Sequence, residues 1–289
     1  MCIRDRYIVP ALLGGMLTLQ SCEHFLDTKP TETYSEELVW GSRSTADAFV
    51  LRTYPDILGL YHDFWGDDQI TLNTILRQSC PGEARDLINR EHDFGFNKFS
   101  IIRRCNLIIE QASASTALSD LDKKELVAEG KMLRAMIYYY QAKHCGRVIW
   151  VDRVLQVDDE FNLPLTESID RTYDLILSDL DDAIAGLPEE YPAGRANANA
   201  ARALKSEVCL TAAAYTTDAT RKKTLWEQAV VAVDAIQGYS LDANYGGMFN
   251  QENSYSSTEI ILARYFSKEN TNGGDTYTVS YTHLTLPTI

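Results

Sequence analysis

The chain has 289 residues, enough for one large domain or two small ones with a sizeable core. It is 45% hydrophobic and 24% charged, which is the composition of a folded protein and excludes wholesale disorder. The formal net charge of −14 repels phosphates and anionic lipid, so we exclude nucleic acid as a partner. Neutral ligands such as sugars or peptides remain compatible with this surface.

An apolar run over residues 7–20 is the first element, and it ends abruptly at Ser21-Cys22. It is shorter than the roughly 20 residues that span a bilayer, and it fits the apolar core of a secretory signal. The sequence LQSC resembles a bacterial lipobox, in which the cysteine is acylated and becomes the first residue. Because two glycines and a proline within the run disfavour a core helix, we predict a signal peptide over 1–21 and lipidation at Cys22. The alternative is a buried N-terminal helix with an incidental cysteine.

The two ends of the chain do not continue the patterns of its interior. MCIRDR at residues 1–6 and VSYTHLTLPTI at residues 279–289 resemble translated sequencing-adapter sequence, and we expect both to be foreign. Residues 22–43 show no helical period and are predicted to be an irregular, lipid-anchored tether. A helical domain, truncated at its C-terminus, is predicted over residues 44–278.

Within that domain, apolar residues recur at helical spacing in six stretches. Pro55 is expected to kink or split the first helix, Ser119 to cap the third, and Gly146 to end it. Residues 147–166 are predicted to be non-helical, and EIILARYF at 259–266 to be a short buried strand. The predicted helices cover 45–61, 99–114, 119–145, 168–186, 199–214 and 225–236.

Aromatic and acidic residues gather in one predicted loop after the first helix. A sugar ring offers an apolar face, which flat aromatic rings contact, and a rim of hydroxyl groups, which carboxylates and amides bind. The loop supplies both kinds of group. In the alternative interpretation its aromatic rings fill the core and its aspartates cap the next segment. The glycan-binding candidates are Tyr61, Phe64, Trp65, Asp67, Asp68 and Gln69.

Other reactive residue types carry no recognisable site. None of the six cysteines forms a C-x-x-C pair and the five histidines are scattered, so we expect neither a metal site nor a cofactor. Cys105, Cys145 and Cys209 lie in helical patterns and are predicted to be small buried residues. The acids of DLDDAIAGLPEE, residues 179–190, are predicted to lie on a solvated helix face. Of the consecutive tyrosines at 138–140, at least one must enter the core, because consecutive helix residues point in different directions.

No hydrolase, phosphate-binding or dinucleotide motif occurs, and we predict that the protein is not an enzyme. Two helical stretches rich in small residues, around Arg134 and Ala203, lie about 70 residues apart, near twice the 34-residue tetratricopeptide period. We therefore predict a mainly α fold of tetratricopeptide-like helix hairpins with irregular loops and a few short strands. An ordinary helical bundle is the alternative.

Five runs of residues stand out along residues 19–268. They are the lipobox with EHFLDTKP, then EGKMLRAMIYYYQAKHCGRV, TYDLILSDLDDAIAGLP, GRANANAARALKSEVCLTAAAY, and LWEQAVVAVDAI followed by GYSLDANYGGMF and TEIILARYF. Together these runs resemble the SusD/RagB family of outer-membrane lipoproteins from Bacteroidota, and they occur in the family's order. The chain departs from the family at HCGRVI, residues 144–149, where members have Tyr-Gly-Asp-Val-Pro, and family members are commonly much longer.

The resemblance implies a protein that does no chemistry. Members bind glycans at the cell surface and cap a SusC-like TonB-dependent transporter, with the helical repeats as the docking scaffold and aromatic-bearing loops as the sugar site. The expected partners are therefore a polysaccharide or oligosaccharide, that transporter, and the outer membrane through the lipid anchor. Two alternatives remain open: a helical-repeat scaffold that binds protein or peptide, and a glycoside hydrolase fragment, which would need two carboxylates across a cleft.

Overall fold

The computed structural model describes residues 36–60, 97–246 and 257–265. The chain divides into two units, residues 1–39 and 40–289. The described part of the first unit is one short helix, α2 (Glu36–Val39), which lies in the stretch predicted to be an irregular tether. That prediction is wrong for these four residues, because one helical turn is too short to show a period of 3.6 residues.

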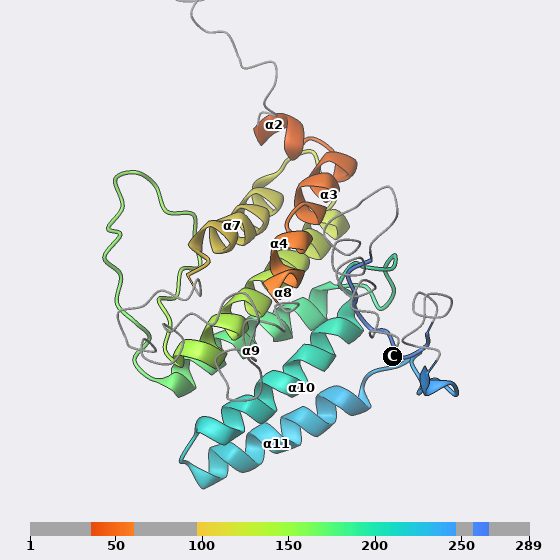
Figure 1. Cartoon of the computed structure of the whole chain (residues 1–289). Coiled ribbons are helices and arrows are strands. Elements are labelled where there is room, and N and C mark those ends of the chain that lie inside the picture. The colour runs from red at the N-terminus through yellow and green to blue at the C-terminus, as the bar shows by residue number, and fades with distance from the viewer. Residues whose placement is uncertain (1–35, 61–96, 247–256, 266–289) are drawn as a thin grey trace, which may run out of the picture. The chain divides into compact units, whose positions relative to one another are not determined.

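The described part of the second unit is built from helices joined by irregular segments (Figure 1). The mainly α prediction is confirmed, but the predicted strand is not: residues 257–265 form turns and bends, and the described ranges contain no strand. Residues 259–265 are only half-buried, and their backbone has no neighbouring strand to pair with among the described residues. The helices are α3 (Arg43–Leu51), α4 (Tyr54–Leu58), α7 (Phe99–Ala114), α8 (Asp120–Cys145), α9 (Ile169–Gly186), α10 (Ala198–Tyr215) and α11 (Ala219–Asp234).

Local signals account for most of these boundaries. The first predicted helix is split into α3 and α4, with Pro55 in the first turn of α4, where a missing N–H costs no helical hydrogen bond. Ser119 caps α8 by accepting from the Asp122 amide at 3.2 Å. The same helix ends at Gly146, whose φ of 73° suits glycine.

The predicted start of the last described helix is wrong by six residues. The sequence predicts a start at residue 225, where its apolar residues begin, whereas α11 begins at Ala219. The Asp218 side chain accepts hydrogen bonds from the amides of Thr220 and Arg221, at 2.8 and 3.2 Å, and so caps the helix. The first turns of α11 are polar and therefore carry no apolar period.

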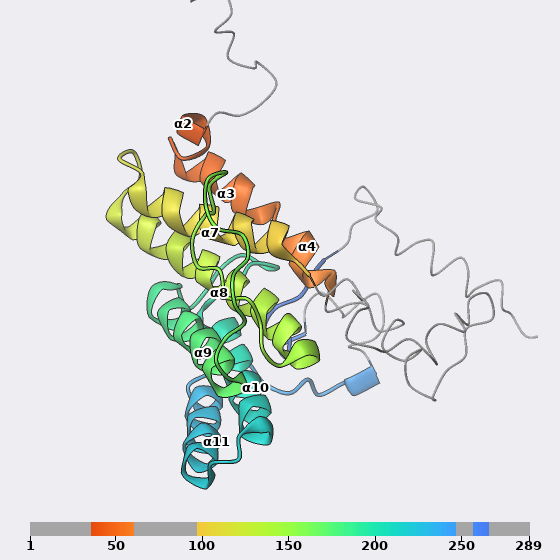
Figure 2. The ribbon, with the colours of Figure 1, turned by 90° about the vertical axis from the view of Figure 1, so that its left-hand side faces the viewer.

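Helices α7 to α11 pack in chain order, each against the next, while α3 and α4 lie against α8 (Figures 1 and 2). Only residues 216–218 join α10 to α11, so the two form a helix hairpin as predicted. The helices approach closely where side chains are small. A Cβ atom on Gly130 of α8 would lie 2.8 Å from Ile109 and 3.0 Å from Ile108 of α7.

The core lies between these helices. Tyr138 and Tyr139 are buried and Tyr140 is half-buried, which agrees with the prediction that at least one tyrosine of the three enters the core. Cys105 and Cys209 are buried, but Cys145 is exposed, so its prediction is wrong. Cys145 is the last residue of α8, directly before the capping Gly146, and the apolar pattern of the helix does not extend its buried face to this position. Among the described residues, no helix combines the length and apolar character needed to cross a bilayer.

Candidate functional site

The residues predicted to carry lipid and sugar lie outside the described ranges. This applies to the lipidation candidate Cys22. It applies equally to all the glycan-binding candidates, namely Tyr61, Phe64, Trp65, Asp67, Asp68 and Gln69.

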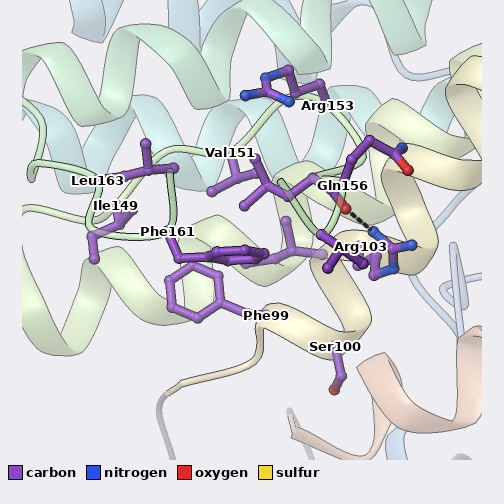
Figure 3. Close-up of a pocket in the computed structure, with 12 residues that line it drawn as sticks. Phe99, Ser100, Arg103, Ile149, Val151, Arg153, Gln156, Phe161 and Leu163 are labelled. Atoms are coloured by element: carbon purple, nitrogen blue, oxygen red, sulfur yellow. Dashed lines mark hydrogen bonds between the residues drawn. The ribbon is translucent and has the colours of Figure 1, made fainter. Parts of the chain in front are cut away.

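A cavity of about 480 Å³ lies within the described residues, between the first turns of α7 and the non-helical segment that follows α8 (Figure 3). We call it the α7 cavity. Its walls are mainly apolar, and its two phenylalanine rings lie together in Figure 3, away from Arg103. Its lining residues are Phe99, Ser100, Ile102 and Arg103 of α7, and Ile149, Val151, Arg153, Leu155, Gln156, Val157, Phe161 and Leu163 of the segment.

Side chains of the neighbouring helices hold the backbone of this segment in place. Asn106 of α7 donates to the carbonyl oxygens of Val151 and Arg153, both at 2.9 Å. The Tyr138 hydroxyl of α8 accepts from the Val151 amide at 2.6 Å. Glu110 accepts from the amide of residue 154 at 2.7 Å. Because a buried non-helical backbone must satisfy its polar groups elsewhere, these side chains build a fixed wall for the cavity.

Arg134 of α8 links the residues that hold this segment to helix α9. It forms a bidentate ion pair with Asp179, with both N–O distances at 2.7 Å, and it also donates to the Asn106 side chain at 2.9 Å and to the carbonyl oxygen of Asp152 at 3.1 Å. Both side chains of the pair are 6% exposed. Burial raises the pKa of the Asp179 carboxyl, and the hydrogen bonds from Arg134 offset only part of that rise.

The position of Asp179 corrects the prediction that the acids of residues 179–190 share a solvated face. Asp181 and Asp182 do lie on that face, with side chains 57% and 54% exposed, and they pair with Lys205 and Lys131. Asp179 instead faces α8 and Arg134. Its sequence neighbours therefore do not indicate its environment.

A second buried ion pair joins α8 to the loop before α10. Arg195 donates to both oxygens of Glu129, at 2.8 and 2.6 Å, and the Tyr54 hydroxyl donates to the same carboxylate at 2.5 Å. The Ala196 amide donates to the Tyr54 hydroxyl at 3.0 Å. Burial, followed by the neighbouring Glu129 charge, raises the pKa of Tyr54 well above its ordinary value. With its oxygens engaged in this way, Glu129 joins three segments of the chain and lines no described cavity.

The chemistry of the α7 cavity is that of an apolar binding site. Among the described residues, neither aspartate nor glutamate lines it, so the two-carboxylate hydrolysis that the sequence leaves open gains no support there. Arg153 pairs with Asp159 at 2.6 Å, whereas Arg103 donates to the carbonyl oxygen of Leu155 at 2.6 Å. Phe99 and Phe161 are 36% and 64% exposed. The cavity therefore offers apolar surface, two accessible aromatic rings and a guanidinium group.

The sequence prediction did not identify this cavity, although a signal for it exists. Its lining residues from the segment occupy mainly odd positions between 149 and 163, which is the period of two that an extended chain shows. Turns near residue 158 interrupt the period, so the pattern does not predict a continuous strand. The lining from α7 lies some 50 residues earlier in the chain, a distance that no local pattern bridges.

Known proteins share this arrangement of helices and parts of the sequence. No model of a protein family matches the chain. A SusD-like protein of Bacteroides ovatus is 26% identical over 172 residues, which are 58% of this chain and 31% of the relative. The SusD-like protein P25 of Formosa agariphila is 24% identical over 275 residues, which are 86% of this chain and 50% of the relative. The chain thus spans only 31% and 50% of the length of these two curated relatives.

The solved structures give the same result. A SusD-like protein of Bacteroides fragilis is 32% identical, with a TM-score of 0.51 over 59% of this chain and 33% of the other. A SusD-like carbohydrate-binding protein from the same organism is 20% identical, with a TM-score of 0.64 over 78% of this chain and 47% of the other. NanU of B. fragilis is 18% identical, with a TM-score of 0.69 over 86% of this chain and 52% of the other. In the helices it contains, in their order and in these stretches of sequence, the chain is similar to SusD-like proteins.

Proposed function

We propose that this protein is a lipid-anchored, surface-exposed glycan-binding protein of the outer membrane that delivers oligosaccharide to a SusC-like TonB-dependent transporter. One observation carries the proposal: the described helices share the fold of a SusD-like carbohydrate-binding protein over 78% of this chain. Cys22, at the end of the apolar run, is the proposed site of lipidation.

The proposed glycan site is the aromatic and acidic stretch between α4 and α7. Tyr61, Phe64 and Trp65 supply rings for the apolar face of a sugar. The polar side chains Asp67, Asp68 and Gln69 supply acceptors for its hydroxyl groups. The described lining of the α7 cavity offers no such set of acceptors, which is why we do not place the sugar there.

Substitution of Trp65 tests this assignment. Trp65→Ala removes one stacking ring, and we expect affinity for the cognate polysaccharide to fall by about tenfold without a loss of helix content. The measurements are retention in polysaccharide-containing native gels and far-UV circular dichroism. Trp226→Ala is the matched control, because Trp226 is 52% exposed on α11 and is not one of the proposed glycan-binding residues.

Retention that is the same for Trp65→Ala and wild type would exclude Trp65 from the sugar site. A wild-type chain that no polysaccharide in a broad panel retains would contradict glycan binding itself. That second result would leave the protein-binding scaffold as the better function, which the apolar character of the α7 cavity favours independently.

A further inference from the structure

We propose that the α7 cavity is a docking site for a partner protein, which inserts one apolar side chain and places an adjacent carboxylate beside Arg103. The proposal goes beyond glycan binding and does not depend on it. It follows from three features of the described residues: an exposed apolar mouth, a prebuilt wall and a cation, Arg103, that has no carboxylate partner among them.

The mouth of the cavity carries apolar side chains that the fold leaves in water. Val157 is 97% exposed, Phe161 is 64% exposed and Phe99 is 36% exposed. Each adjoins the same 480 Å³ space, so together they form a continuous apolar surface around a recess. Apolar surface gathered around a recess is typical of an interaction site, whereas single exposed apolar residues are not.

Hydrogen bonds from neighbouring helices hold the wall of the cavity in place. Asn106, Glu110 and Tyr138 together bond the backbone of the segment from Val151 to Val154, as described above. Arg103 fixes the next residue by donating to the carbonyl oxygen of Leu155. An incoming side chain therefore does not have to order the wall, which removes one of the main costs of binding.

The charges at the cavity select an acidic partner. Asp159 neutralises Arg153, whereas Arg103 has no carboxylate partner among the described residues, although the chain carries a net charge of −14. An exposed guanidinium beside apolar walls recognises a carboxylate attached to an apolar group. A neutral sugar fits poorly, because the Gln156 amide already donates to the carbonyl oxygen of Val154 at 3.3 Å and few polar groups remain for hydroxyls.

Binding of short peptides to the full chain tests the proposal. The probe is a fluorescein-labelled hexapeptide with the central pair Asp-Phe between Gly and Ser residues, together with versions in which Asn replaces Asp or Ala replaces Phe. Fluorescence polarisation should show saturable, millimolar-range binding of the Asp-Phe peptide, with affinity lowered by about tenfold when Ala replaces Phe. Equal polarisation curves for the Phe and Ala peptides, or no binding at millimolar concentration, would overturn the proposal.

Variants locate the binding on the molecule. Val157→Asp places a charge at the apolar mouth and should lower the affinity by about tenfold, because the new carboxylate also repels the peptide. Leu241→Asp is the matched control: Leu241 is 88% exposed on another irregular segment, and the affinity should stay at the wild-type value. Equal losses in the two variants would contradict a site at the cavity. Polysaccharide retention should be unchanged in Val157→Asp, which separates this test from that of the glycan site.

The role of Arg103 is tested by comparing the effect of its substitution on the affinity of a charged and a neutral peptide. Arg103→Gln should weaken the Asp-Phe peptide by up to about fivefold and leave the Asn-Phe peptide unaffected. Equal weakening of both peptides would mean that Arg103 acts only by holding Leu155, and would overturn the acidic part of the proposal. Sedimentation of the wild-type chain tests whether a second copy of this chain occupies the cavity instead. A wild-type dimer that Val157→Asp dissociates would support that occupant and overturn the proposal of a partner protein.

Discussion

Arg134 and Asp179 show what a single buried pair contributes to this fold. The pair joins α8 to α9, and Arg134 also bonds the side chain of Asn106 and the carbonyl oxygen of Asp152. Two charges removed from water lose hydration, so their value to stability depends on each keeping its partner. Truncation of one partner leaves the other as an uncompensated charge in a buried site.

Asp179→Ala should therefore lower the free energy of unfolding by about 3–5 kcal/mol, measured by urea denaturation. The control is Asp182→Ala on the same helix, where the carboxylate is 54% exposed. For that variant we expect a change of about 1 kcal/mol or less, because exposed ion pairs contribute little.

The double variant Arg134→Met, Asp179→Leu distinguishes the cost of an unpaired buried charge from the loss of the other hydrogen bonds of Arg134. If the loss in Asp179→Ala comes mainly from the stranded guanidinium, the double variant should be more stable than that single variant. A double variant no more stable than Asp179→Ala would show that the hydrogen bonds of Arg134 to Asn106 and the carbonyl oxygen of Asp152 matter more than the charge balance.

At the scale of elements, close contact between α7 and α8 depends on a missing side chain. The Cβ atom that alanine would add at Gly130 meets Ile109 at 2.8 Å, Ile108 at 3.0 Å and the carbonyl oxygen of Cys105 at 3.4 Å. Alanine is the better helix former by about 1 kcal/mol, so propensity and packing act in opposite directions at this position.

We expect packing to prevail: Gly130→Ala should lower the free energy of unfolding by about 1–2 kcal/mol in thermal or urea denaturation. Ser178→Ala, on the exposed face of α9, measures the propensity effect without a clash. A Gly130→Ala chain as stable as wild type would mean that the two isoleucines move aside at no cost.

For the whole molecule, the proposed function requires attachment to the membrane, and Cys22 is the residue proposed to provide it. Cys22→Ser, expressed from the native gene in a Bacteroidota host, should release the protein from the outer-membrane fraction and abolish incorporation of labelled palmitate, because serine offers no thiol for the acyl chains. Fractionation and autoradiography measure both effects, and Cys145→Ser controls for loss of a cysteine exposed in the folded chain. An unlabelled wild-type protein, or one recovered from the cytosol, would contradict lipid anchoring.

Local features of the sequence by themselves determined most of the helix boundaries. The bounds of α7 were predicted residue for residue, and Ser119 and Gly146 mark the ends of α8, because caps and apolar periods act between residues that are neighbours along the chain. Where the local signal was weak, as in the polar first turns of α11, the prediction was wrong. The resemblance that indicated the family likewise rested on runs of adjacent residues.

Only the tertiary structure decided which side chains meet. Asp179 lies in an acidic stretch that reads as solvated, yet its partner Arg134 is 45 positions away and buries it. The α7 cavity likewise combines one end of a helix with a segment that starts some 50 residues later. Burial and ion pairing depend on distances in space, and these are set by the packing of α7, α8 and α9 rather than by any local pattern.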